Sequence, residues 1–355
     1  MGIAAPAWAG SAAENQRTET TLLAVGDDLI HSGVYAAART GHGYDFSPIF
    51  KHVKKDIKAA DIAVINQETI FTTGSPSGYP CFGSPVALGR AIADAGFDVV
   101  QCATNHTMDR GSGAITSTIG WWEKHHPEIK VLGIHKSAKA ARKITVVKSN
   151  GIKIAMLNYT YGLNGFSLPA GKGYLVDRLS SKSKIARDIH RAKKKADIVV
   201  VFGHMGTEYR LTPDSSQTSW ARWFADHGVD LYVGTHPHVL EPVKWVKGNN
   251  GNKMLCYYSL GNFVSNQSQV ATLLGGMAQV TIVKGRAGKV RIASWSITPL
   301  VTHKSANGKH YTVYKLSDYS NELAAKNRIR KQTSDTFTVA SLKALFKKAT
   351  GVAAK

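Results

Sequence analysis

Short apolar runs alternate with longer amphipathic segments over most of the chain. Runs that stop at glycine or at polar residues are typical of buried strands, and they predict strands over residues 21–25, 61–65, 97–103, 130–133, 198–202 and 229–233. Apolar residues at helical spacing predict helices over residues 47–59, 86–95, 114–125, 182–196 and 215–227. Because helices and strands alternate, we predict an α/β fold with mixed sheets.

Strands without an intervening helix predict three hairpins, over residues 143–158, 239–259 and 277–298. The first turns at Asn150-Gly151, a dipeptide typical of tight hairpins. After residue 302 the pattern weakens, and a Lys/Ala-rich segment offers two candidate helices over 321–331 and 340–348. We therefore predict a main domain over residues 21–302 and a basic C-terminal appendage over 303–355.

Residues 1–20 form a predicted leader. Ala7-Trp8-Ala9 matches the small-residue cleavage pattern of secretory signals, without the basic start and full apolar stretch that usually precede it. We interpret this segment as the remnant of a signal, which favours an exported protein associated with the cell envelope.

The 355 residues carry a formal net charge of +21, and 43% of them are hydrophobic, as in globular proteins. The charge predicts an acidic partner, which can be a nucleic acid, an anionic lipid or an acidic polymer. We expect no nucleic acid, because the sequence has no recognition-helix, RNA-binding or zinc-finger signature. The three cysteines include no CxxC pair, which argues against a disulfide framework and a thiolate zinc site.

Side chains that can bind metal follow five predicted strands directly. They are Asp27 (with Asp28 and His31), Asn66 and Glu68, Asn105 and His106, His204 and Glu208, and His236 and His238. Ligand sites of open α/β sheets lie beyond the carboxyl ends of the strands. Imidazole and carboxylate together suit Zn, Fe or Mn. These candidates are too many for one tetrahedral ion, so we infer two divalent ions that share a carboxylate and activate a bound water.

The most compact of these signals is Gly234-Thr235-His236-Pro237-His238. If the chain stays extended past the strand, the imidazoles of His236 and His238 point to the same side. By themselves the two histidines could also be an ordinary pair in a surface loop. The four other strand ends favour the metal site.

The same stretches resemble the CapA family of capsule and poly-γ-glutamate synthesis proteins. The matching segments are residues 26–31, 66–69, 103–111, 203–209, 234–238 and 258–263. The family is similar to calcineurin-like metallophosphoesterases, and the resemblance implies a four-layer α/β/β/α sandwich. It also implies an acidic partner polymer, such as poly-γ-glutamate or another envelope polyanion, and a capsule-synthesis complex at the membrane.

The resemblance further implies roles for individual residues. The implied metal ligands are Asp27, Glu68, Asn105, His204, His236 and His238. His106 would protonate the leaving group or organise the ligands, and Asp109 and Glu208 are further catalytic candidates.

Two positions depart from the pattern of the wider group. Leu29 stands where that group has histidine, and Glu68 stands where aspartate is usual. His31 could supply the missing ligand, or it could be a helix-capping or supporting histidine, and the sequence leaves both possibilities open.

Two functional hypotheses follow from the sequence. The first is a divalent-metal hydrolase that cleaves a phosphoester or an amide-type bond in envelope polymer metabolism. The second is a non-catalytic accessory protein that binds or exports an acidic polymer. The strand-end residues favour the first hypothesis, and the charge of +21 favours the second.

Overall fold

The computed structural model describes residues 18–354, which form two large sheets. The eight-stranded sheet has the order β18-β17-β16-β1-β4-β7-β8, and β15 pairs with β1. Its strands are β1 (Thr18–Asp28), β4 (Ile62–Gln67), β7 (Val99–Gln101), β8 (Lys130–Leu132), β15 (Asn262–Val264), β16 (Leu274–Lys284), β17 (Val290–Lys304) and β18 (Tyr311–Lys315). The predicted leader, residues 1–20, lies almost wholly outside the described residues.

The six-stranded sheet has the order β13-β14-β12-β11-β10-β9. Its strands are β9 (Thr145–Ser149), β10 (Ile152–Thr160), β11 (Ile198–His204), β12 (Leu231–Thr235), β13 (Val243–Lys247) and β14 (Lys253–Tyr257). The described residues also form two short two-stranded sheets. One pairs β2 (Arg39–Thr40) with β3 (Gly43–Tyr44), and the other pairs β5 (Phe71–Thr72) with β6 (Ser84–Pro85).

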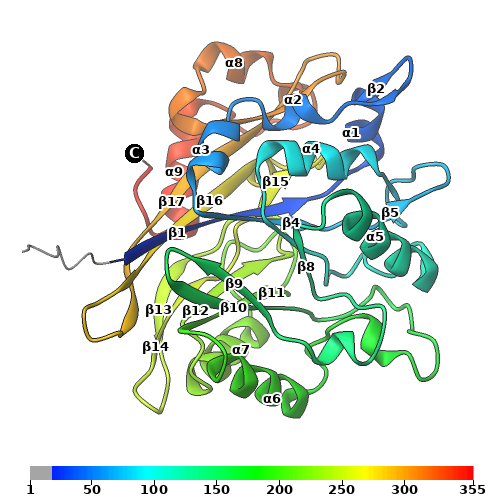
Figure 1. Ribbon diagram of the computed structural model, residues 1–355. Helices are drawn as coiled ribbons and strands as arrows, with labels where there is room; N and C mark the ends of the chain where they lie inside the picture. The colour runs from blue at the N-terminus through cyan, green and yellow to red at the C-terminus, as the bar shows by residue number, and fades with distance from the viewer. Residues whose placement is uncertain (1–17, 355) are drawn as a thin grey trace, which may run out of the picture.

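Helices cover the outer face of each sheet, as Figure 1 shows. Those on the eight-stranded sheet are α1 (Ser32–Ala37), α2 (Ser47–Phe50), α3 (Lys54–Ala59), α4 (Ala87–Ala95) and α5 (Gly111–His125). The six-stranded sheet carries α6 (Lys182–Lys193) and α7 (Ser215–Asp226). No helix in the described part of the chain is long and apolar enough to cross a membrane.

The alternation of side chains along β1 explains the layers. Leu22 and Ala24 point into the core between the two sheets, whereas Leu23 and Val25 point into the core beneath the helices. A third core lies between the six-stranded sheet and α6 and α7, and includes Ile185 of α6. The predicted four-layer α/β/β/α sandwich is therefore confirmed.

Local signals set several element boundaries as predicted. Gly96 ends α4 at φ 103°, a left-handed conformation that glycine adopts without strain. Asn150 and Gly151 also have positive φ in the turn between β9 and β10. The predicted helix over residues 47–59 is wrong in one respect, because a turn separates α2 from α3. This turn buries Val53 completely, and its N–H donates to the carbonyl of Phe50 at 3.0 Å.

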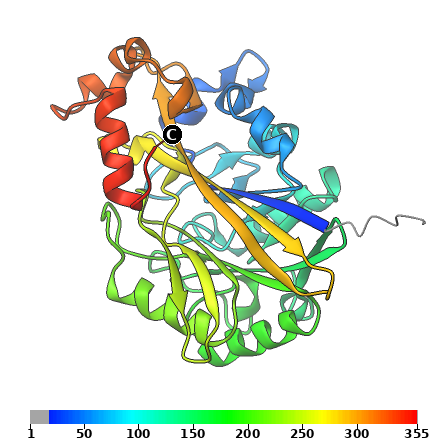
Figure 2. The same ribbon diagram turned by 90° about the vertical axis from the view of Figure 1, so that its left-hand side faces the viewer.

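The C-terminal segment, predicted as a separate appendage over 303–355, is part of the sandwich. β17 crosses the predicted boundary, and β18 pairs with it. The segment also forms α8 (Asn321–Lys326) and α9 (Val339–Thr350), which lie on the β17 side of the sandwich (Figure 2). Phe337, Leu342 and Phe346 are buried in the core between the sheets. The prediction missed this packing because the Lys/Ala-rich composition of the segment indicated a solvated appendage.

Lys304, at the end of β17, is a buried cation. Its ammonium donates to the carbonyl of Gln267 and to Oε1 of Gln332, the latter at 3.3 Å. Within residues 18–354 no carboxylate forms an ion pair with it. Burial, together with the smaller effect of the nearby charge of Arg328, lowers the pKa of Lys304 to about 8.

This lowered pKa predicts a pH-dependent stability. Between the folded pKa of about 8 and the ordinary value of 10.5, the unfolded chain retains a proton that folded Lys304 has released. The free energy of unfolding should therefore rise with pH over this range, by at most about 1.4 kcal/mol per unit. The Lys304→Met variant should lack this rise, because it has no proton to release. Urea unfolding across this range tests the prediction, with Lys289→Met on an exposed turn as the control. Parallel curves for the wild type and Lys304→Met would contradict it.

Candidate metal centre

The strand ends of both sheets meet at one edge of the sandwich. β1 and β4 run parallel in one sheet, and β11 and β12 run parallel in the other. Residues at or just after their ends form three groups in which the possible ligand atoms lie within 4.8 Å of one another. The groups are Glu68 with His204 and His236, Asp27 with Glu68 and His238, and Glu208 with His236 and His238. Since each group shares members with the others, the three form one cluster.

Two glycines allow the chain segments around this cluster to approach closely. A Cβ on Gly26 would lie 1.8 Å from the carbonyl oxygen of Gly261, and a Cβ on Gly234 would lie 1.9 Å from that of Tyr258. Both distances are far too short for any side chain. The segment from Tyr258 to Gly261 therefore packs directly against β1 and β12, and the N–H of Asp27 donates to Gly261 at 2.9 Å.

Asp27 is buried at the centre of a hydrogen-bond network. Its Oδ1 accepts from Nδ2 of Asn66 at 2.8 Å, and its Oδ2 accepts from the backbone N–H of His236 at 3.3 Å. Nδ1 of His238 lies 3.0 Å from Oδ2 and 3.1 Å from Oδ1 of Asn262. These contacts fix the carboxylate and orient the His238 ring, whose Nε2 is turned toward Glu68.

Glu68 is buried, and within the described residues neither of its carboxylate oxygens has a hydrogen-bond partner. Oε1 lies 3.7 Å from Nε2 of His204 and 3.9 Å from Nε2 of His238. Burial raises the pKa of Glu68 well above its usual value, and the neighbouring carboxylates, Asp27 first, raise it further. A buried carboxylate without a donor is costly, and cations beside both oxygens would compensate it. The residues therefore fit a divalent metal.

The histidines of the cluster are suited to metal coordination. Burial lowers the pKa of His204 and of His236 well below the usual value, and neighbouring histidines add to the shift. Both rings are therefore neutral at pH 7, which is the form that binds metal. His204 is held at both nitrogens, by Oγ1 of Thr235 at 2.9 Å and by Oδ1 of Asn105 at 2.8 Å.

The backbone at His236 and His238 is not extended as the sequence predicted. Their φ angles are 98° and 61°, in the left-handed region that residues other than glycine seldom adopt. Such a conformation costs on the order of 1–3 kcal/mol and persists where its surroundings enforce it. Here a turn around Pro237, rather than strand alternation, brings both rings to the same site.

His106 lies beside the cluster in a fixed orientation. Its Nδ1 is 2.7 Å from Oδ2 of Asp109, which also accepts the backbone N–H of Phe82 at 2.7 Å. The Phe82 ring contacts the imidazole edge to face, with centroids 4.6 Å apart. Because Asp109 accepts the proton on Nδ1, Nε2 of His106 is the nitrogen left for other contacts.

The two remaining predicted residues, Glu208 and His31, lie in different surroundings. Glu208 is exposed, and its carboxylate joins the group with His236 and His238. His31 belongs to none of the three groups of described residues. It directly precedes α1, makes no capping bond with its side chain, and packs against Phe82 at 5.1 Å. Burial lowers its pKa to about 4.

The sequence did not identify Asn164, which supports both Asn105 and His106. Its Oδ1 accepts from Nδ2 of Asn105 at 3.1 Å, and its Nδ2 lies 3.3 Å from Nδ1 of His106. Asn164 follows β10, which runs parallel to β11 and ends at the same edge. The strand-end rule, by which site residues follow the carboxyl ends of parallel strands, did not identify it. The predicted hairpin stopped at residue 158 and was not expected to run parallel to the next strand.

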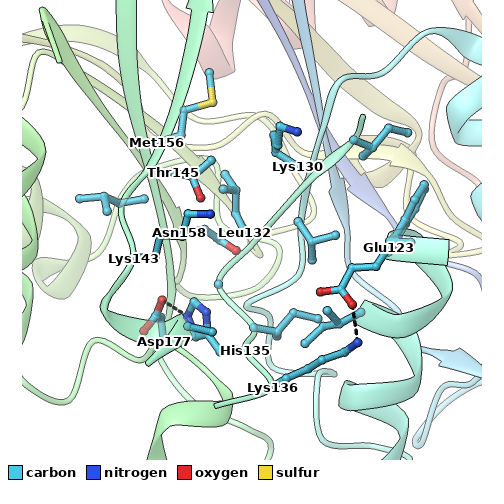
Figure 3. A pocket seen from close by; sticks show the side chains of 18 of the residues that line it. Glu123, Lys130, Leu132, His135, Lys136, Lys143, Thr145, Met156, Asn158 and Asp177 are labelled. Carbon is cyan, nitrogen blue, oxygen red and sulfur yellow. Dashed lines mark hydrogen bonds and ion pairs between the residues drawn. The ribbon is translucent and has the colours of Figure 1, made fainter. Parts of the chain in front are cut away.

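A separate cavity of about 430 Å³ lies between β8 and the β9–β10 hairpin. Figure 3 shows Leu132, Thr145 and Met156 on one side of it and the His135–Asp177 pair, 2.7 Å apart, on another. None of the predicted site residues lines this cavity, so it is distinct from the metal centre.

The two stacked sheets, with a carboxylate and histidine cluster at their strand ends, define a metallophosphatase-like fold. A solved structure of a putative 5'-nucleotidase from Staphylococcus aureus in complex with alpha-ketoglutarate has the same fold, with a TM-score of 0.50 and 14% identity over 79% of this chain and 54% of that one. The model of the family "Bacterial capsule synthesis protein PGA_cap" matches residues 21–267, and the chain belongs to this family.

Two curated relatives agree with this assignment. The chain is 34% identical over 223 residues to the PGA biosynthesis protein CapA of Bacillus subtilis (strain 168), a match that covers 61% of this chain and 54% of the relative. It is 28% identical over 277 residues to the capsule biosynthesis protein CapA of Bacillus anthracis, covering 75% and 64%. The chain thus spans between half and two thirds of the length of these relatives.

Proposed function

We propose that this chain is a divalent-metal hydrolase that acts in capsule polymer metabolism and cleaves a phosphoester or an amide-type bond. One observation carries the proposal: Glu68 is a buried carboxylate with no donor among the described residues, and it is shared by two groups of possible ligands. A bridging carboxylate between two divalent ions meets this description. Manganese, iron and zinc suit the surrounding nitrogen and oxygen donors.

The proposed ligands divide into two sets around Glu68. Asp27 and His238 would hold one ion with Glu68, and His204 and His236 would hold the other. Asn105 lies beside His204 and offers an amide oxygen to the second ion. Glu208 is placed to complete this set from the exposed side. His31 lies outside these groups, so we propose a supporting role for it beneath Phe82.

Bound there, a pair of divalent ions would supply an activated water and would offset charge on the leaving oxygen. The chain supplies the proton. Asp109 holds Nδ1 of His106, which leaves Nε2 as the atom that donates a proton to the leaving group. Phe82 packs edge to face against the ring.

The relatives named for capsule and PGA biosynthesis support an acidic polymer as the partner, and the net charge of +21 agrees with this choice. We also propose that the protein works at the cell envelope, in contact with a capsule-synthesis complex. A purely accessory role, in which the protein binds or exports polymer without cleaving it, is the second candidate, and the same charge favours it.

Elemental analysis paired with turnover of bis(p-nitrophenyl) phosphate separates these possibilities. The wild-type protein should retain about two equivalents of metal and hydrolyse the diester. His236→Ala and His238→Ala should lose metal and activity but remain folded, whereas His190→Ala, at an exposed position of α6, should lose neither. Full metal content in the first two variants would contradict the ligand assignment. Bound metal without hydrolysis of the diester or of an amide-linked polymer would favour the accessory role.

Asp109→Asn tests the proton donor. The variant should retain its metal, because Asp109 is in none of the ligand groups. Its kcat should fall by about 100-fold, since an amide no longer fixes the protonated Nδ1 of His106. Asp98→Asn is the matched control, because Asp98 likewise accepts a backbone N–H but lies at the opposite end of β7. Equal kcat values in the two variants would exclude the role of His106.

A further inference from the structure

Exposed aromatic side chains gather around the metal centre. Among residues 18–354, the large apolar side chains that are exposed are Tyr79, Tyr161, Phe166, Tyr209 and Trp245, with exposed fractions of 80%, 47%, 43%, 42% and 49%. Tyr161 and Tyr209 contact His236 and His238 themselves. Tyr79 and Phe166 lie in the same loops as Phe82 and Asn164, which contact His106. Only Trp245, in β13, lies elsewhere. Exposed aromatic surface that gathers in one place is typical of a binding site.

Tyr161 and Tyr209 are the two of these that touch the cluster itself. The Tyr161 ring lies 4.7 Å from the ring of His236, and the Tyr209 ring lies 6.1 Å from that of His238, measured between centroids. Each is fixed through its backbone, because Tyr161 N–H donates to His204 at 3.0 Å and Tyr209 N–H donates to Pro237 at 2.9 Å. The two rings therefore flank the pair of histidines and leave about half of their surface to solvent.

The conformation of Tyr209 shows that this placement is enforced. Its φ is 66°, in the left-handed region, which costs free energy for any residue with a side chain. Its hydroxyl accepts a hydrogen bond from Nε2 of Gln267 at 3.1 Å. Gln267 in turn accepts from Nδ2 of Asn262, whose Oδ1 lies beside His238. The position of the Tyr209 ring is thus tied to the same contacts that orient a proposed metal ligand.

Two half-exposed aromatic rings beside a metal centre suit a substrate in which the reacting group is carried on a ring. The amides of Asn164 and Gln267 lie at the edges of the two tyrosines, at 3.5 Å from the Tyr161 hydroxyl and 3.1 Å from the Tyr209 hydroxyl. A saccharide matches both features, because its C–H face packs on aromatic rings and its hydroxyls pair with amides and phenols. An extended polyglutamate strand has no ring to place there.

We propose that Tyr161 and Tyr209 form a stacking platform that selects phosphoesters carried on a sugar ring. This inference rests on the proposed metal-dependent hydrolase and names the class of substrate for the same site. The inference predicts that the sugar ring contributes to the binding affinity independently of turnover. Calorimetry on the metal-loaded protein can measure this contribution.

The test compares two phosphate monoesters, glucose 1-phosphate and glycerol 3-phosphate, which differ in the ring. The wild type should bind the first about 10-fold more tightly, which corresponds to about 1.4 kcal/mol, because only this ester has a ring to pack on the tyrosines. Tyr161→Ala and Tyr209→Ala should each reduce this ratio toward one, whereas Tyr161→Phe should preserve it. Trp245→Ala is the control and should change nothing. Thermal unfolding checks that the variants, all at exposed positions, remain folded.

Other outcomes overturn the proposal in distinguishable ways. Equal binding of the two esters, or a ratio that the alanine variants do not change, would show that the rings do not select the substrate although the metal site stands. Tighter binding of adenosine 5'-phosphate than of glucose 1-phosphate would assign the platform to a nucleobase instead. A wild-type protein that contains no metal and binds neither ester would refute the proposed hydrolase, and this inference with it.

Discussion

Glu68→Gln is expected to remove nearly all of the metal from the protein, whereas Asp28→Asn is expected to retain it. Both residues are buried carboxylic acids at the end of a strand in the same sheet, and neither has a hydrogen-bond partner among the described residues. Their side chains point in different directions. Glu68 faces His204 and His238, at 3.7 and 3.9 Å from its Oε1.

Asp28 lies on the other face of β1. Asp27 pairs in register with Asn66, and Asp28 pairs with Gln67, so their side chains alternate. Gln67 accepts a hydrogen bond from Nε1 of Trp122 at 3.0 Å, which places this face in the core beneath α5. Asp28 therefore faces away from the centre and contributes no ligand.

The size of the effect follows from charge. Glutamine keeps the shape of Glu68 but removes the negative charge between the two proposed cations, which would then repel each other without compensation. Loss of a residue that only supports a ligand costs about 10- to 100-fold in metal affinity, and loss of a bridging ligand should exceed that. Competition with a chelator measures both variants, and circular dichroism checks their fold. Similar affinities in Glu68→Gln and Asp28→Asn would mean that Glu68 does not bridge.

The strand-end rule explains why so much of this centre could be predicted. Parallel strands deliver their carboxyl ends to one edge, and short apolar runs that stop at glycine or polar residues identify the strands. Asp27, Glu68, His204, His236 and His238 could therefore be grouped before their distances were known. What brings the last two rings together could not be predicted, because the left-handed turn at His236 and His238 depends on contacts with Asp27, a residue more than 200 positions away.

Long-range packing also explains the other errors. The helix predicted over residues 47–59 has continuous apolar spacing, yet the chain turns at Val53 to bury it against a distant core. Asn164 carries no charge and fits no motif, so its place beside His106 became visible only when β10 was found to end at the same edge as β11. In α9 the lysines and alanines indicated a solvated tail, although Leu342, Phe346 and Ala349 are buried.

A chain that ends after Leu316 is expected to lose its cooperative fold, although no proposed metal ligand lies beyond that point. The deletion removes Phe337, Leu342, Phe346 and Ala349, all of which are buried in the core between the two sheets. Their absence would leave that core open along the β17 side. The metal centre would be lost as well, because its ligands come from strands on both sides of the same core.

Phe346→Ala is the quantitative form of this prediction. Removing a fully buried phenylalanine costs about 3–5 kcal/mol, which is a large part of the stability of an ordinary domain. A triple variant, Lys343→Gln with Lys347→Gln and Lys348→Gln, changes only exposed positions of the same helix and should alter the free energy of unfolding by less than about 0.5 kcal/mol per substitution. Urea unfolding distinguishes the two. If Phe346→Ala were as stable as the triple variant, α9 would be a charged appendage as its composition suggests. If the triple variant alone lost salt-sensitive binding to an acidic polymer while retaining its fold, the charge of α9 would belong to the polymer surface and its apolar face to the core.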